Sequence, residues 1–247
     1  MSLSSFAPHA NVAVIGATGG IGQALVTKLE SDPGIASVHA MSRQAEPGGS
    51  EPVTRHFIDL TDEESIDQAI AAATSAEPLD LVIVATGILH RRDGLRPEKS
   101  MGDLQPAAMA DVFAINTIGP ALVAKYCLPR MRRGHKTVFA AISARVGSIS
   151  DNRLGGWMSY RASKAALNMI MKSLAVEQAR RSPDSVVVTL HPGTVATRLS
   201  RPYSQNVPGQ QLFTADQSAN YLLNVIDALH TRDSGGFFAW DGSGIEF

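Results

Sequence analysis

Cysteine is almost absent from the chain, which has a single one, Cys127, among its 247 residues. A lone thiol excludes an internal disulfide framework and any metal site built from paired cysteines, and it fits a reducing compartment. Runs of like charge are also missing, and the formal net charge is −1. This balance argues against a nucleic-acid partner held by bulk electrostatics.

Long apolar runs are missing as well. No window approaches about 18 uninterrupted apolar residues, so the sequence predicts no membrane span. The opening stretch MSLSSFAPHA lacks a basic region followed by a long apolar one, so we expect no signal peptide. Apolar residues make up 44% of the chain, enough for a sizeable core. We therefore expect a soluble, cytoplasmic, globular protein.

Short apolar runs alternate with longer stretches of helical periodicity along the chain. The apolar runs predict strands within 11–16, 37–42, 52–60, 79–87, 136–143, 185–193 and 235–242. Helical spacing predicts helices over 21–31, 61–76, 104–131, 158–181 and 215–230. The second helix opens on a capping-box pattern at Thr61-Asp62-Glu63-Glu64.

This alternation, with apolar strands, indicates a parallel sheet covered by helices on both faces. Right-handed crossovers then give a doubly wound, Rossmann-type α/β fold of about seven strands. No internal repeat, linker or low-complexity segment interrupts the pattern, so we expect a single domain over residues 1–247.

A glycine-rich turn, GATGGIG, joins the first expected strand to the first helix. Glycines allow a tight turn and a close approach to a pyrophosphate, and the helix N-terminus adds free N–H groups and a positive dipole. An ordinary strand-to-helix turn is the alternative. The place of GATGGIG after an apolar strand and before a helix favours dinucleotide binding. The expected contacts are Gly16, Thr18, Gly19, Gly20, Ile21 and Gly22.

The end of the second expected strand lacks the acid that NAD-binding folds place about 20 residues beyond the glycines. The sequence there reads Ser42-Arg43, a hydroxyl and a guanidinium that suit a 2′-phosphate. We therefore expect NADP(H) to be preferred over NAD(H). The alternative is that Arg43 is simply a solvated loop residue.

The stretch YRASK, residues 160–164, places a phenol and an ammonium four positions apart in the longest helical run. Positions i and i+4 share a helix face. A phenol with a pKa of about 10 is a poor acid or base at neutral pH. A neighbouring ammonium and a cationic nicotinamide both favour the phenolate and lower that pKa. The pair predicts that Tyr160 exchanges a proton with a carbonyl or alcohol oxygen; a pair on a surface helix is the alternative.

Taken in order, these motifs make the chain resemble the short-chain dehydrogenase/reductase family over nearly its whole length. The resemblance rests on GATGGIG at 16–22, INTIGP around Asn116, ISARVGS at 142–148, YRASK at 160–164 and HPGTVAT at 191–197. Stretches such as GILH and YRASKAALN resemble the subgroup of C-factor-like and sniffer-type carbonyl reductases. The resemblance implies an NADP(H)-dependent enzyme that interconverts a carbonyl and an alcohol. A weakly active or inactive nucleotide-binding regulator with this fold is the alternative.

The same resemblance implies roles for further residues. Lys164 would also hydrogen-bond the nicotinamide ribose, and Asn116 would hold a water that links Lys164 to solvent. The alternative for Asn116 is a polar helix residue whose side chain bonds to the backbone. Asp59 and Leu60 match the family's adenine contacts, although Asp59 also fits an acid that precedes a helix. Cofactor contacts are further implied for Gly87, Tyr160, Lys164, Pro192, Gly193, Val195 and Thr197.

Two stretches depart from the family's pattern. A Ser-Ser pair followed two residues later by glycine usually supplies the hydroxyl that orients the substrate carbonyl, but SARVG at 143–147 has alanine at the acting position. We expect Ser143 to take this catalytic role, with Ser148 or no hydroxyl as the alternatives. The fourth strand ends in VATG at 84–87 where the family has Asn-Asn-Ala-Gly, which puts local rigidity in doubt.

The expected partner is a small carbonyl or alcohol substrate, with specificity in Leu89–Gly102 and Arg198–Thr214, two irregular segments that follow strand ends. The second segment, which includes Pro208 and Gly209, has the composition of an apolar lid. His191 ends a buried strand and is expected to be structural. Two helices carry apolar residues on more than one face, which favours a homo-oligomer, a dimer or tetramer, or else deep burial in a monomer.

Overall fold

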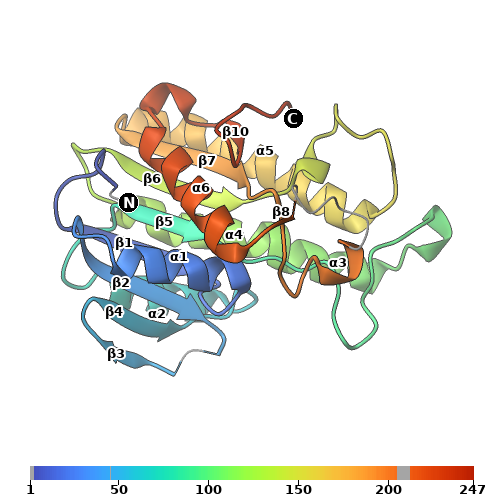
Figure 1. The fold of residues 1–247 in the computed structure, drawn as a ribbon, viewed down its shortest axis with the longest axis horizontal. Coiled ribbons are helices and arrows are strands. Elements are labelled where there is room, and N and C mark those ends of the chain that lie inside the picture. Colours follow the sequence, from blue (N-terminus) through green and yellow to red (C-terminus); the bar gives the residue numbers. More distant parts are fainter. Residues whose placement is uncertain (1–2, 45, 205–211) are drawn as a thin grey trace.

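The apolar runs form one central sheet in the computed structural model, which describes residues 3–44, 46–204 and 212–247. The strand order is β10-β7-β6-β5-β1-β2-β4-β3 (Figure 1). These strands are β1 (Ala10–Ile15), β2 (Ile35–Ser42), β3 (Gly48–Ser50), β4 (Val53–Phe57), β5 (Leu81–Val84), β6 (Thr137–Ile142), β7 (Ser185–His191) and β10 (Phe237–Ala239). All of the pairs are parallel except β3 with β4. The predicted doubly wound fold is confirmed.

Helices cover both faces of the sheet. On one face lie α1 (Gly20–Glu30) and α6 (Ala215–Ala228), and on the other α2 (Glu63–Ala73), α4 (Gly119–Cys127) and α5 (Met158–Arg181). Side chains alternate between the two faces of a strand. Val12 and Val14 of β1 therefore pack under the first layer, while Ala13 and Ile15 pack under the second. Burial on both faces explains why the central strands are mostly apolar rather than alternating between apolar and polar residues.

Three short strands were not predicted. β3 has the sequence Gly-Gly-Ser and pairs antiparallel with β4 at the edge of the sheet. β8 (Thr194–Val195) and β9 (Leu212–Phe213) form a separate two-stranded sheet beyond β7. These strands carry little or no apolar alternation, so their formation depends on neighbouring strands rather than on a local pattern.

The long helical region predicted over 104–131 is broken into pieces. α3 (Pro106–Phe113) leads into a π-helical turn at Ala114–Ile118, and α4 ends in a 3₁₀ turn at Leu128–Arg130. Isolated π turns in α-helices are rare and are often found at functional sites. Here the turn contains Asn116, one of the predicted catalytic residues.

By length and composition alone, this run of 25 residues, Pro106–Arg130, is apolar enough to cross a membrane. In the fold it packs against α2 and α5, and it buries Val112, Val123 and Cys127. Of the apolar window, 39% is buried, so packing against the neighbouring helices accounts for part of this composition.

The start of α2 differs by one residue from the predicted capping box. The N-cap is Asp62, whose side chain accepts hydrogen bonds from the N–H groups of Glu64 at 3.1 Å and Ser65 at 3.3 Å. Thr61 instead donates to Asp59. Aspartate is as good an N-cap as threonine, and it adds a negative charge at the positive end of the helix.

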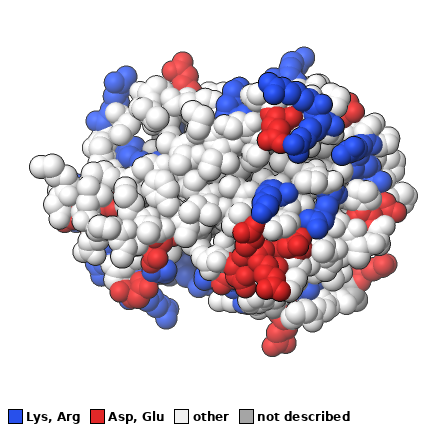
Figure 2. Space-filling model, turned by 180° about the vertical axis from the view of Figure 1, so that it is seen from behind, with Lys and Arg blue, Asp and Glu red and all other residues white. Residues whose placement is uncertain are grey.

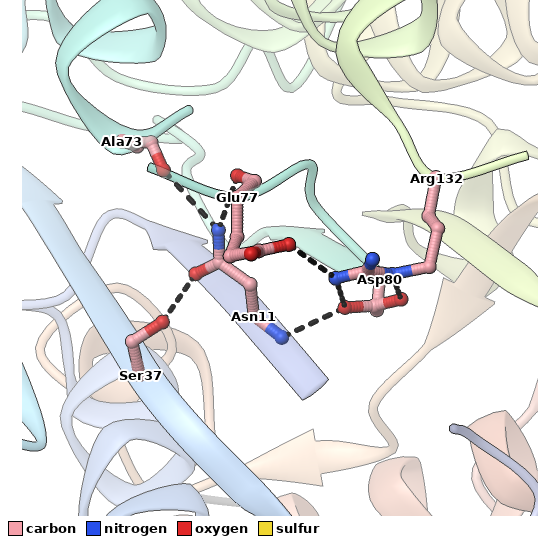
Figure 3. A network of polar contacts seen from close by, with 6 residues as sticks. All are labelled: Asn11, Ser37, Ala73, Glu77, Asp80 and Arg132. Carbon is pink, nitrogen blue, oxygen red and sulfur yellow. Dashed lines mark hydrogen bonds and ion pairs between the residues drawn. The ribbon is translucent and has the colours of Figure 1, made fainter. Parts of the chain in front are cut away.

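A polar network fastens the edge of the sheet at which β1 and β5 begin (Figure 3). The buried carboxylate of Asp80 accepts from the backbone N–H of Asn11 at 2.8 Å and from Nε of Arg132 at 2.7 Å. The side chain of Asn11 donates to the carbonyls of Ala73 and Glu77. The network therefore joins β1, the end of α2, β5 and the segment after α4.

Asp80→Ala should lower the free energy of unfolding by about 3 kcal/mol, because it leaves the Asn11 N–H and the Arg132 guanidinium without their buried acceptor. Glu77→Ala is the matched control. It removes only the outer ion pair of Arg132, at 3.3 Å and with Glu77 65% exposed, and should cost less than about 1 kcal/mol. Urea unfolding of both variants measures the difference, and equal losses would contradict the role of Asp80.

Candidate active site

The predicted cofactor and catalytic residues converge at the carboxyl ends of the parallel strands. A Cβ atom placed on Gly16 would lie 2.9 Å from Thr86, and one on Gly20 would lie 3.0 Å from Thr197. A Cβ on Gly87 would lie 3.7 Å from both Asn116 Oδ1 and Lys164 Nζ. Segments far apart in the sequence thus meet at the edge where open α/β sheets bind ligands.

The turn between β1 and α1 requires glycine at two positions. Gly16 has a φ of 90°, and its N–H donates to the carbonyl of Met41 at 2.8 Å. A Cβ on Gly22 would lie 2.2 Å from the Gly16 carbonyl oxygen, so no larger residue fits there. The N-cap residue of α1 is Gly19, which has no side chain to accept a hydrogen bond from the first N–H groups of the helix. The N–H groups of this helix start are therefore open to an anion, as a pyrophosphate site requires.

The end of β2 presents one exposed cation. Ser42 is 5% exposed, and its hydroxyl accepts from the Gln44 N–H at 3.3 Å, whereas Arg43 is exposed. Burial alone would raise the pKa of Asp59. The hydrogen bonds from Thr61 and the positive charge of Arg43 outweigh burial, so the pKa of Asp59 lies below its usual value. Arg43 thus lies close enough to Asp59 for their charges to interact. Of the Ser42-Arg43 pair, Arg43 is exposed and Ser42 is buried.

Leu60 has a packing role. It is 5% exposed, and its side chain fills the space where a Cβ on Gly119 would lie, 2.7 Å from Leu60 Cβ. Only its backbone is left for a ligand. Asp59 directs Oδ1 at both the N–H and the hydroxyl of Thr61, at 2.9 and 2.8 Å. The alternative role for Asp59, as an acid that precedes a helix, is thus also present.

The predicted catalytic residues lie together on the buried side of α5. Tyr160 is 8% exposed and Lys164 is 2% exposed, so they are not a pair on a surface helix. Lys164 Nζ donates to the carbonyl of Ile142 at the end of β6 at 2.8 Å. This bond holds the ammonium beneath the cleft, one helical turn from Tyr160.

Asn116 joins the end of β5 to α5. Its Oδ1 accepts from the Ile88 N–H at 2.8 Å, and its Nδ2 donates to the Ile88 carbonyl at 2.9 Å and to Ser163 Oγ at 3.1 Å. Ser163 Oγ in turn donates to the carbonyl of Tyr160 at 2.7 Å. Both bonds from Nδ2 are committed, while Oδ1 accepts one bond and keeps a second lone pair, so a water held by Asn116 could bind at Oδ1 or at its backbone.

The expected lowering of the Tyr160 pKa is not found, because burial outweighs the neighbouring amine, and burial shifts the pKa values of Tyr160 and Lys164 in opposite directions. It raises the pKa of Tyr160 to about 12 and lowers the pKa of Lys164 to about 7. Both changes follow from desolvation, which disfavours the charged form of each group. At neutral pH the phenol is therefore protonated, which is the form that donates a proton.

The family model described as short chain dehydrogenase matches residues 10–208. The chain belongs to the short chain dehydrogenase family. The predicted resemblance is therefore confirmed.

Individual relatives fit the same family. C-signal of Myxococcus xanthus is 35% identical over 178 residues, covering 72% of this chain and 98% of the relative. A 1-hydroxy-2-glutathionyl-2-methyl-3-butene dehydrogenase of Rhodococcus sp. (strain AD45) is 31% identical over 242 residues, covering 90% and 99%. An NADPH-bound carbonyl reductase from chicken fatty liver has 28% identity and a TM-score of 0.82, covering 98% and 100%. The carbonyl reductase Sniffer of D. melanogaster, at 23% identity and a TM-score of 0.79 over 97% and 100%, shares the fold.

The similarity to C-factor-like carbonyl reductases expected from the sequence is borne out by C-signal and by the chicken carbonyl reductase. The chain is therefore an oxidoreductase of the short chain dehydrogenase family that acts on CH–OH or C=O groups.

The hydroxyl that orients the substrate in other short chain dehydrogenases is the least regular feature of this site. Ser143 is 2% exposed, and its Oγ is buried with no hydrogen-bond partner among the described residues. Ser148 Oγ lies 3.2 Å from Ser150 Oγ and accepts from the Asp151 N–H. Ser148 is thus used within its own loop, and Ser143 keeps the only uncommitted hydroxyl of the two.

His191 closes β7 beside the site. Its Nδ1 accepts from the Arg145 N–H at 3.4 Å. Burial, together with the charge of Arg145, lowers the pKa of His191 to about 4. The imidazole is therefore neutral and serves as a backbone acceptor, in agreement with the expected structural role.

A row of aromatic side chains extends from Tyr160 through Trp157 and Tyr203 to His90. The ring of Trp157 lies edge-on to Tyr160, with centroids 6.3 Å apart, and to Tyr203 at 5.1 Å. His90 lies 5.8 Å from Tyr203. His90 and Tyr203 belong to the two predicted specificity segments, of which residues 205–211, with Pro208 and Gly209, lie outside the described residues. We call Trp157, Tyr203 and His90 the aromatic wall.

Proposed function

We propose that this chain is an NADP(H)-dependent carbonyl reductase in which Tyr160 is the general acid. The observation that carries the proposal is the buried Tyr160–Lys164 pair, with Lys164 held at the carboxyl end of β6 by its bond to the Ile142 carbonyl. The chicken carbonyl reductase that resembles this chain is described as NADPH-bound, which supports the same cofactor here.

The residues present suit a dinucleotide. The open helix start behind Gly19 and the close packing at Gly22 form a cradle for a pyrophosphate. Thr86 Oγ1 is buried without a partner beside this turn, as expected for a group that a ligand satisfies. When bound, the cofactor would supply the hydride. The residues that would hold it are Gly16, Thr18, Gly19, Gly20, Ile21, Gly22, Ser42, Arg43, Asp59, Leu60, Gly87, Tyr160, Lys164, Pro192, Gly193, Val195 and Thr197.

Tyr160 donates its phenolic proton to the carbonyl oxygen of the substrate. The protonated state that burial enforces makes Tyr160 ready for this step at neutral pH. Lys164, when charged, stabilises the phenolate that remains. Asn116 fixes the backbone of α5 through Ser163, and Ser143 is the hydroxyl closest in sequence to the orienting position.

A second candidate is a nucleotide-binding regulator with little activity. Alanine at 144 and the burial of Ser143 favour it, because a missing orienting donor slows the chemistry. NADPH consumption with a panel of aldehydes, ketones and quinones separates the two. Turnover of any of them supports the reductase, and NADPH binding without turnover supports the regulator.

NADP(H) preference rests on Arg43 at the end of β2. Arg43→Ala should weaken NADPH binding by about 10- to 100-fold, the value of a charge-assisted hydrogen bond, and leave NADH binding nearly unchanged. Fluorescence titration with both nucleotides measures this. Arg181→Ala, at the far end of α5, should change neither affinity. Equal weakening of NADPH and NADH by Arg43→Ala would refute the phosphate assignment.

We also propose a homo-oligomer that buries the face formed by α2, α4 and α5, which Figure 2 shows with a broad uncharged area across its middle. Ile118, Met169 and Val176 are 52%, 67% and 50% exposed. Light scattering should give at least twice the chain mass of 26.2 kDa. Met169→Glu should shift it toward the monomer, since a charge would be buried in the interface. A wild-type monomer would contradict the proposal.

A further inference from the structure

The catalytic helix α5 begins without a cap of its own. Its N-cap residue, Trp157, makes no side-chain cap bond, and the first turn contains no acid. A helix leaves its first N–H groups unpaired and carries a partial positive charge at this end. The buried start of α5 therefore needs a partner from elsewhere in the chain.

Glu98 provides that partner from the segment between β5 and α3. Its carboxylate accepts from the Ser159 N–H at 3.2 Å and from the Ser159 hydroxyl. Its backbone carbonyl accepts from the Trp157 N–H at 2.6 Å. Glu98 is 5% exposed and Ser159 is 3% exposed. No ion pair involves Glu98 among the described residues. The N–H at the helix start and the Ser159 hydroxyl therefore offset the cost of burying the Glu98 carboxylate.

The turn that leads into α5 is held in an unusual conformation. Gly155, Gly156 and Trp157 have φ values of 63°, 67° and 51°. For a tryptophan, a positive φ costs on the order of 1 kcal/mol or more and persists only where the surroundings enforce it. The bond from the Trp157 N–H to Glu98 and the contact of its ring with Tyr203 provide this enforcement.

We propose that Glu98 is a positioning residue that fixes Tyr160 at the cleft, an inference that rests on the proposed reductase function. Glu98 binds Trp157 and Ser159, which come shortly before Tyr160 in the chain. Glu98 also lies in Leu89–Gly102, so it joins a substrate-side segment to Ser159 through its carboxylate and to Trp157 of the aromatic wall through its backbone carbonyl. A displacement of a reacting group by about 1 Å can cost 100-fold in rate.

The test compares Glu98→Ala, Glu98→Gln and Ser159→Ala. Glu98→Ala should lower kcat by about 10- to 100-fold and leave the Kd for NADPH unchanged within about twofold, because the cofactor cradle is separate. Glu98→Gln keeps one oxygen as an acceptor and should recover much of the loss, and Ser159→Ala should fall between them. Glu177→Ala, an exposed glutamate near the end of the same helix, should match wild type.

A second readout follows the position of Trp157 directly. The chain has two tryptophans, so Trp240→Phe leaves Trp157 as the sole reporter. In this background Glu98→Ala should shift the Trp157 emission to longer wavelength, and Glu98→Gln should do so less. Glu98→Ala with wild-type kcat and emission would overturn the inference, as would equal losses of kcat in Glu98→Ala and Glu177→Ala. A wild-type protein that binds NADPH but reduces no carbonyl would instead contradict the proposed function.

Discussion

Tyr160→Phe is expected to lower kcat for carbonyl reduction by about 10³-fold, within the range attributed to general acid catalysis. Phenylalanine keeps the ring that packs edge-on against Trp157 and removes only the hydroxyl. The fold and the pyrophosphate cradle at the turn between β1 and α1, which is built from other segments, should be unaffected. NADPH oxidation under saturating substrate gives kcat, and fluorescence titration gives the Kd for NADPH, which should stay within about twofold of wild type.

Tyr126→Phe is the matched control for this change. Tyr126 lies on α4 and donates to the exposed Glu63 at 2.9 Å, away from the cleft. Its loss should leave kcat unchanged. If Tyr160→Phe turned over every active substrate at the wild-type rate, the proton would have to come from another group and the proposed mechanism would be wrong.

Lys164→Met should lose at least about 100-fold in kcat and yet stabilise the protein without cofactor at neutral pH. Burial lowers the pKa of Lys164 from 10.5 to about 7. Below about pH 7 the amine is charged in both the folded and unfolded states, and the folded state bears the full cost of burying that charge. Methionine has a similar length and no charge to bury.

The sign of the pH dependence follows from linkage. Between pH 7 and 10.5 the unfolded chain binds more protons at Lys164 than the folded chain, so wild-type stability at this site rises with pH. The gain in stability of Lys164→Met over wild type should therefore be largest at pH 7 and below. It should decrease as the pH rises from 7 to 10.5. The lost bond to the Ile142 carbonyl offsets part of the gain.

Thermal unfolding of wild type and Lys164→Met across this pH range measures the effect. Lys172→Met, on the exposed side of the same helix, should show no such pH-dependent gain. A Lys164→Met protein that is less stable than wild type at neutral pH would contradict the cost of burying the amine. Wild-type turnover in this variant would contradict the catalytic role.

Much of the fold follows from the sequence because burial on both faces of a parallel sheet leaves a strong local signal. β1 and β6 are buried at every position, and their runs are apolar except for Asn11 and Thr137. The bounds of α5 were predicted without error, since its 24 residues contain no proline or glycine. β3 escaped prediction because its residues, Gly48–Ser50, take their conformation from the neighbouring β4.

Residues of the site could be predicted from the sequence only where the interacting residues lie close together in the chain. Tyr160 and Lys164 share a helix face four residues apart, so their spacing reveals the pair. The bonds from Asn116 to Ile88 and Ser163 span 28 and 47 residues, and the bond from Ser159 to Glu98 spans 61. No local pattern encodes such contacts. The burial of Ser143 likewise depends on how the end of β6 meets its neighbours, which the sequence order does not specify.

A crystal structure of the chain soaked with NADP⁺ tests the account most directly. We predict that the nucleotide lies across the carboxyl ends of β1, β5 and β7, with its 2′-phosphate at Arg43. The nicotinamide should lie beside the hydroxyl of Tyr160, within hydrogen-bonding reach of Lys164 at its ribose. A dinucleotide bound elsewhere, or a Tyr160 hydroxyl turned away from the nicotinamide, would contradict the account.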